Sequence, residues 1–227
     1  MSERQRTPPP DRDTAHYSVV VRRSAAALPT VAGYLAQLPD GLHSYPAARV
    51  KGLTLRTLVL DPVHPLEVGT GLPSALEDLV AHPPAPGDWV PVVWLCALHA
   101  GVYDTSFASD GGMLAYEEWV FQRNLRLLRA PLFRRLVEVQ SPELLLALHT
   151  ARWSAFYRGS SLDILQVEPG RAVFRMSHPP RCWPTLAVTG LGAAFRAAAV
   201  VAGAKTATVA VTEESPRASR LAVSWSV

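Results

Sequence analysis

The sequence predicts an α+β protein in which a helical N-terminal part is followed by a β-β-α-β-β unit. Three observations support this prediction. Apolar residues recur at helical spacing through residues 113–159, and after Gly159 they alternate with a period of two, as in strands. A run of small residues from 184 to 202 then separates two pairs of strand-like segments. Their short connections predict an antiparallel four-stranded sheet with one helix across a face.

Length and composition predict how the chain is divided and where it resides. Its 227 residues can form one domain, or a domain with a smaller lobe. We expect a disordered arm over residues 1–15, an N-terminal lobe over 16–88, and a helical segment with the C-terminal sheet over 89–227, packed with the lobe as one compact domain. No apolar run is long enough to span a bilayer, and the charged N-terminus does not resemble a signal peptide. These features predict a cytoplasmic protein without a membrane partner.

The N-terminal half contains short elements separated by prolines and glycines. We expect a strand over residues 16–22, a helix over 24–38, a segment over 47–60 that fits helix or strand, and a helical turn over 74–81. A buried helix over 91–100 and a loop over 101–112 follow. In the ambiguous segment we favour a helix after Gly52. In the helical turn, Ser74 is the candidate N-cap and Glu77 follows three residues later, which is the spacing of a capping box.

Two helices and a short helical turn fill the central stretch. The first helix, over 114–129, has an apolar face flanked by arginines. The turn covers residues 132–139. The second helix, over 142–157, has a clear start because Ser141 can cap it and a proline follows at the first helical position. Gly159 is its expected end.

The C-terminal segments supply the sheet and the helix that covers it. Four strands are expected, over residues 162–167, 172–176, 206–212 and 221–227. The first two flank a Pro-Gly pair that suits a tight turn. The helix between the two pairs contains Gly190 and Gly192, each of which costs about 1 kcal/mol relative to alanine. These glycines predict a close approach of the helix to the sheet or to a more N-terminal helix.

Four short motifs carry a resemblance to a known family. They are Val50-Lys51-Gly52, Ser141-Pro142-Glu143-Leu144, Arg152-Trp153 and Arg158-Gly159. Residues 50–227 resemble a family of uncharacterised proteins expanded in myxobacteria, which is distantly similar to the 4-vinyl reductase and haem nitric-oxide-binding fold group. The resemblance implies an α+β fold and a role in small-molecule sensing or signalling. It supplies no catalytic residues.

The chain departs from the relatives that bind haem or carry cysteines. The haem-binding relatives use a histidine as axial ligand and a Tyr-x-Ser-x-Arg motif for the propionates, and this motif is absent. The 4-vinyl reductase relatives carry cysteines near the final hairpin, whereas residues 213–220 contain none. We therefore expect no haem and no other cofactor.

No group of residues in the sequence predicts an enzyme or a metal site. Cys96 and Cys182 are too few for a disulfide framework and are expected to be free thiols. His178 and Cys182 offer two metal ligands, but a structural zinc site needs four. The glycines of residues 69–74 lie in a proline-rich loop, not in a βαβ unit, and Ser160 lacks the surroundings of a hydrolase nucleophile.

Two hypotheses of different classes remain. The first is a non-enzymatic sensor or adaptor that holds a small apolar ligand between the central helices and the C-terminal sheet. Its candidate ligand-binding residues are Trp119, His149, Trp153 and Tyr157. The alternative interpretation of His149 is a core histidine that is hydrogen-bonded to a backbone carbonyl.

The second hypothesis is a protein–protein interaction module with a solid core and no ligand. Its candidate partner-binding residues are Arg123, Arg126 and Arg129, since guanidinium groups bind acidic partners well. The same arginines also fit a solvated helix surface. The net charge of +3 is spread along the chain, so no nucleic-acid partner is predicted. The oligomeric state is left open by the sequence.

Overall fold

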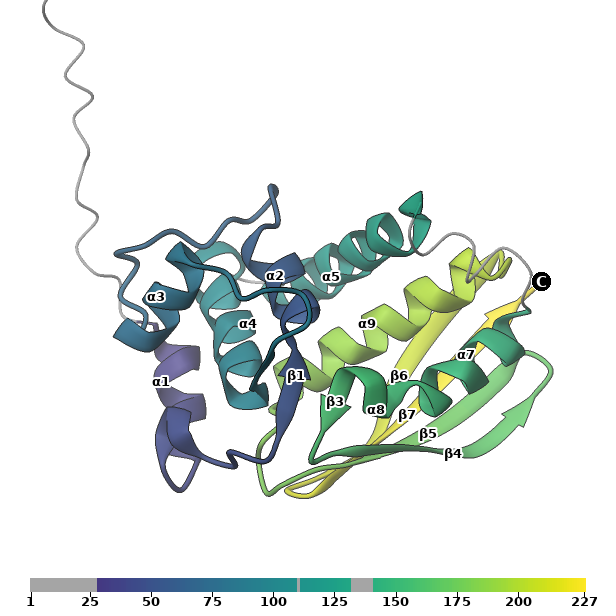
Figure 1. Ribbon diagram of the computed structural model, residues 1–227. Coiled ribbons are helices and arrows are strands. Elements are labelled where there is room, and N and C mark those ends of the chain that lie inside the picture. The colour runs from purple at the N-terminus through teal and green to yellow at the C-terminus, as the bar shows by residue number, and fades with distance from the viewer. Residues whose placement is uncertain (1–27, 110, 132–140) are drawn as a thin grey trace, which may run out of the picture.

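The architecture is α+β, as the sequence predicts, and its C-terminal half is the predicted β-β-α-β-β unit (Figure 1). The computed structural model describes residues 28–109, 111–131 and 141–227. The unit consists of four strands and one helix: β4 (Ser161–Glu168), β5 (Arg171–Ser177), α9 (Thr185–Val201), β6 (Thr206–Ser215) and β7 (Ala218–Ser226). The strand order is β4-β5-β7-β6, and every neighbouring pair is antiparallel.

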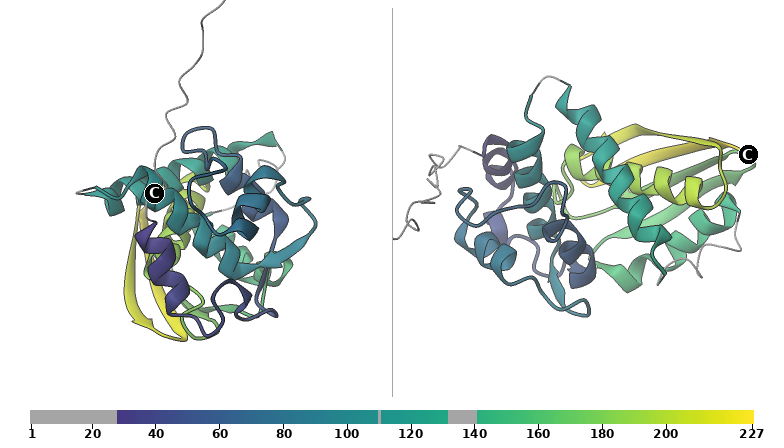
Figure 2. Two further views of the ribbon diagram at one scale, coloured as in Figure 1. Left: turned by 90° about the vertical axis from the view of Figure 1, so that its left-hand side faces the viewer. Right: turned by 90° about the horizontal axis from the view of Figure 1, so that it is seen from above.

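Alternation along the strands gives this sheet one apolar face. Phe174 and Met176 of β5 are fully buried, and Phe174 lies opposite the buried Leu221 of β7. Helix α9 lies across this face against β6 and β7, while α7 (Pro142–Ala151) contacts β4, β5 and α9 (Figures 1 and 2). The period of two therefore places one set of side chains in the core and the other in solvent.

The two glycines of α9 permit close packing on both sides of the helix. A Cβ atom on Gly192 would lie 2.9 Å from Cγ1 of Val209 in β6. A Cβ atom on Gly190 would lie 3.2 Å from the hydroxyl of Tyr116, which belongs to α5 (Gly112–Arg129). The expected close approach therefore occurs both to the sheet and to a preceding helix.

A second, three-stranded sheet joins the N-terminal half to the central stretch. Its strands are β1 (Arg49–Lys51), β2 (Trp89–Pro91) and β3 (Tyr157–Arg158), in the order β2-β1-β3. Gly159 follows β3 with φ +71°, and a Cβ atom there would lie 2.8 Å from Cα of Ala48. Glycine thus allows the chain to pass closely along β1 before it enters β4.

The described part of the N-terminal half also contains helices. They are α1 (Pro29–Ala36), the 3₁₀ helix η1 (Gly41–His43), α2 (Gly52–Val59), α3 (Ser74–Ala81) and α4 (Val92–Ser106). Helix α4 is buried along most of its length and contacts α1, α2 and α9, so it links this group to the C-terminal unit. The Asp104 carboxylate of α4 accepts hydrogen bonds from the backbone N–H groups of Thr30 and Val31, and so caps the start of α1.

Two local predictions about the N-terminal half are wrong. The loop expected over 101–112 is mostly helix, because Gly101 packs against Leu72 and Leu66 and α4 continues to Ser106. Ser74 does not cap α3: Pro73 occupies the N-cap position, and the Glu77 carboxylate accepts hydrogen bonds from the Gly69 and Gly71 N–H groups.

The helix expected over 142–157 is divided. Helix α7 ends at Ala151, α8 (Trp153–Phe156) follows, and Tyr157 already belongs to β3. Pairing of Tyr157 and Arg158 with β1 requires extended backbone, which ends the helix before Gly159. The cap of α7 is as predicted, because the Ser141 hydroxyl accepts a hydrogen bond from the Leu144 N–H.

Some predictions concern segments that lie outside the described residues. These are the arm over 1–15, the strand over 16–22 and the helical turn over 132–139. Among the helices of the described ranges, none is long and apolar enough to cross a membrane.

Candidate functional site

An apolar pocket lies between the helices. Its volume is about 340 Å³, and its walls come from α2, α5, the α7–α8 segment and α9. The described lining residues are Leu53, Thr54, Thr57, Arg123, Asn124, Leu127, Leu128, Leu145, Leu148, Arg152, Trp153, Phe156, Tyr157, Leu191 and Ala194. Two arginines and no acidic residue occur among them, so the described wall carries a net positive charge.

Helical periodicity brings the α5 residues to this pocket. Arg123, Asn124, Leu127 and Leu128 recur at intervals of three and four and therefore share one face of the helix. The side-chain amide of Asn124 donates to the Val120 carbonyl oxygen at 2.8 Å, which holds that side chain along the helix.

An aromatic pair forms one wall. The rings of Trp153 and Tyr157 are stacked with centroids 4.1 Å apart and an interplanar angle of 17°. The Trp153 indole N–H donates to the carbonyl and hydroxyl oxygens of Ser160, which fixes its orientation. Burial raises the pKa of Tyr157, so its hydroxyl is neutral over the physiological range. This wall is rigid and largely apolar.

Among the described residues, Arg123 is a cation without a counter-ion. Its Nη1 atom is buried and has no hydrogen-bond partner, and the described residues place no carboxylate in an ion pair with it. Its Cζ atom lies 5.2 Å from the centre of the Trp119 ring, a cation–π distance. Burial lowers the pKa of the guanidinium, but arginine keeps its charge at neutral pH.

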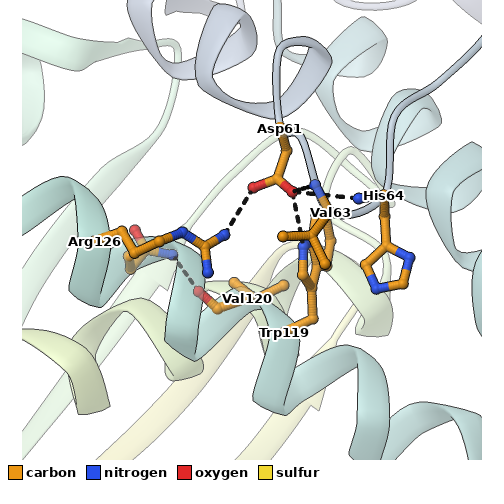
Figure 3. A network of polar contacts seen from close by, with 7 residues as sticks. Asp61, Val63, His64, Trp119, Val120 and Arg126 are labelled. Atoms are coloured by element: carbon orange, nitrogen blue, oxygen red, sulfur yellow. Dashed lines mark hydrogen bonds and ion pairs between the residues drawn. The ribbon is translucent and has the colours of Figure 1, made fainter.

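Arg126, one turn further along α5, has a partner. Its Nη2 donates to the carboxylate of the buried Asp61 at 3.1 Å (Figure 3). The same carboxylate accepts from the Val63 and His64 backbone N–H groups and from the Trp119 indole N–H (Figure 3). This network fixes the segment after α2 against α5, and the Asp61 carboxylate also acts electrostatically on Arg123.

Behind the pocket, α4 and α5 share a buried aromatic cluster. The Tyr116 hydroxyl is 2.7 Å from Nδ1 of His99, and the rings of Phe107, Tyr116 and Trp119 lie within 6 Å of one another. Burial, assisted by the charge of Arg123, lowers the pKa of His99 well below its ordinary value. A smaller cavity of about 80 Å³ lies between His99 and Arg123.

The four predicted ligand-binding residues differ in where they lie relative to the pocket. Trp153 and Tyr157 line the pocket. Trp119 does not: it is buried in the aromatic cluster and hydrogen-bonded to Asp61. His149 belongs to α7, but its side chain lies outside the described part of the structure. These positions locate the residues without testing whether they bind a ligand.

The three predicted partner-binding arginines have different surroundings. Arg123 faces the pocket, Arg126 is bonded to Asp61, and Arg129 is exposed near the end of α5. Sequence reasoning also missed the α2 wall (Leu53, Thr54 and Thr57) and the α9 wall (Leu191 and Ala194). The local pattern of these segments predicts helices with an apolar side but does not say which helices leave a space between them.

His178 and Cys182, the two candidate metal ligands of the sequence, have other surroundings in the structure. The His178 ring nitrogen Nδ1 lies 2.9 Å from the Pro179 carbonyl oxygen, and Cys182 is a buried free thiol. Within the described ranges there is no group of three or more His, Cys, Asp and Glu side chains suited to a metal ion.

Comparison with known proteins gives only distant similarity. No protein-family model and no curated protein matches the chain, so the resemblance to the myxobacterial family stays a prediction. Among solved structures, the unliganded Fe(II) H-NOX protein from K. algicida and its A71G mutant are each 12% identical, cover 78% of this chain and 97% of their own, and have TM-scores of 0.48 and 0.49. A Cs H-NOX mutant is 11% identical, covers 77% of this chain and 96% of its own, and has a TM-score of 0.48. Similarity at this level assigns neither a cofactor nor a role.

Proposed function

We propose that the protein is a non-enzymatic binding protein that holds a small, mostly apolar molecule in the pocket between α2, α5, α7–α8 and α9. A sensor or adaptor role in signalling, in the cytoplasm, is part of the same proposal. The observation that carries it is the pocket itself: about 340 Å³ of space lined mainly by leucines and by the stacked Trp153–Tyr157 pair. Its volume falls within the range of small-molecule sites, which begins at about 300 Å³.

The pocket differs from the first hypothesis in one respect. The expected site lay between the central helices and the C-terminal sheet, whereas the described lining residues come from helices and from Tyr157 of β3. The four-stranded sheet packs against α9, one of the helices that line the pocket (Figure 1).

The alternative, an interaction module with a solid core, has less support. A solid core would leave no space beside Trp153, but Trp153 lines the pocket. Its arginine surface would need Arg123 and Arg126 to face a partner, but one lines the pocket and the other is bonded to Asp61. Arg126 nevertheless keeps half of its side chain exposed and Arg129 is exposed, so these two residues can still reach a partner.

A thermal-shift screen tests the proposal. A panel of neutral apolar metabolites and lipids, including decanol, should contain compounds that raise the melting temperature and change the tryptophan fluorescence, because Trp153 lines the pocket. Ala194→Phe should abolish both responses by filling the pocket, whereas Ala151→Phe, on an exposed position of α7, should leave them intact. A response that survives Ala194→Phe would place binding elsewhere and contradict the proposal.

A further inference from the structure

The charge of Arg123 restricts which molecule the pocket can hold. A guanidinium that is removed from water loses hydration energy, and buried charges in proteins are therefore normally paired. Arg123 has a buried Nη1 without any hydrogen-bond partner. One described compensation is the face of Trp119 at 5.2 Å, a contact worth about 0.5–2 kcal/mol.

No described carboxylate forms an ion pair with Arg123. Asp61 contributes to the electrostatic environment of Arg123, but its oxygens already accept four hydrogen bonds, one of them from Arg126. Glu118, on the same helix, is paired with Arg196 of α9 at 3.0 Å. The described pocket wall contains no acid. A negative charge that pairs directly with Arg123 would then come from outside this part of the chain.

We propose that the ligand is a monocarboxylate with an apolar chain, such as a medium-chain fatty acid, whose carboxylate pairs with Arg123. This inference rests on the proposed function, since it concerns the same pocket. A carboxylate matches the planar guanidinium with two parallel hydrogen bonds. The chain then lies among Leu127, Leu148 and the Trp153–Tyr157 pair.

Charge and volume both favour this class over larger anions. One unpaired arginine inside the pocket balances one negative charge, and the second lining arginine, Arg152, is exposed to solvent. A phosphate carrying two charges would leave one uncompensated in an apolar site. At about 30 Å³ per water-sized group, the volume of about 340 Å³ holds about eleven such groups, close to the twelve non-hydrogen atoms of a ten-carbon acid.

Three probes with one alkyl chain test the inference: decanoate, decanol and decyltrimethylammonium. Calorimetric titration of the full chain should give binding of decanoate that is roughly tenfold to a hundredfold tighter than that of decanol, as expected of a charge-assisted hydrogen bond. The cationic probe should bind most weakly. In Arg123→Met, decanoate should lose its advantage over decanol, and a cooperative urea transition shows that the variant is folded.

Two further variants complete the design. Arg129→Met removes the same charge from an exposed position of α5 and should keep the preference for decanoate. Arg123→Lys keeps the charge without the planar fork and should restore part of the preference.

The outcomes separate the two proposals. Equal binding of decanoate and decanol by the wild type, a preference that survives Arg123→Met, or tightest binding of the cationic probe would overturn the carboxylate inference and leave the apolar pocket standing. Binding of none of the three probes would contradict both.

Discussion

Two arginines on one helix, three residues apart, have opposite surroundings. Arg126 is half exposed and bonded to a carboxylate that also receives backbone and indole hydrogen bonds (Figure 3). Arg123 extends into an apolar pocket, and its buried Nη1 has no partner. The first arrangement satisfies every group and stabilises the fold. The second leaves a buried nitrogen of the guanidinium without a hydrogen-bond partner among the described residues, which is the arrangement expected where a ligand supplies the partner.

This difference shows what residue type alone does not distinguish. Both side chains carry the same charge, and both belong to the same predicted helix surface. Their roles differ because helical geometry turns Arg123 towards α2 and α9, while Arg126 meets the segment that follows α2. Each of the following predictions tests one side of this comparison.

The largest effect is expected at the centre of the satisfied network. Asp61→Ala should lower the free energy of unfolding by about 2–3 kcal/mol, because the Trp119 indole and the Val63 amide lose their acceptor and Arg126 loses its partner. Urea denaturation measures the loss. Asp78→Ala, on the exposed face of α3, is the control and should change stability little. Equal effects of the two substitutions would show that the network does not hold the fold.

Arg123→Met should act in the opposite direction. Removal of an unpaired charge from an apolar pocket should raise the free energy of unfolding of the ligand-free protein by about 1 kcal/mol, after loss of the cation–π contact with Trp119. Thermal or urea denaturation checks the sign. A destabilisation as large as that of Asp61→Ala would mean that Arg123 has a structural partner, and the comparison would fail.

Arg126→Met should lower stability by about 0.5–1 kcal/mol. The effect is small because the arginine is half exposed and water can reach the Asp61 oxygens once it is removed. A double-mutant cycle with Asp61→Asn measures the coupling, and additive effects would show that the ion pair contributes nothing beyond its separate groups.

The smallest expected effect is a dependence on pH at the Asp61 network. Burial alone raises the pKa of Asp61, but the hydrogen bonds from Val63, Trp119 and His64 and the charge of Arg126 bring it below its ordinary value. Ionised Asp61 therefore stabilises the protein above the ordinary carboxyl pKa of about 4, and this contribution is lost as the pH falls through the lower folded-state pKa. The stability difference between wild type and Asp61→Asn should shrink between pH 6 and pH 3. A constant difference would contradict this.

Local patterns were sufficient for most of the elements. Period-two alternation predicted the four strands, and the serine and proline at 141–142 predicted the start of α7, because these signals depend on neighbours along the chain. The α7–α8 division and the three-stranded sheet were missed. Both depend on β1, which lies more than a hundred residues earlier in the sequence and pairs with Tyr157 and Arg158.

The sequence by itself determined the α+β class, the faces of the helices and the presence of aromatic and cationic side chains in the central stretch. Only the tertiary structure decided which of them meet a cavity. Trp119, which shares the helical face pattern of α5, enters the aromatic cluster beside Asp61, while Trp153, Tyr157 and Arg123 surround the pocket. The physical reason is that a pocket is space left between several helices. Its position therefore depends on how these helices pack together and not on any one segment.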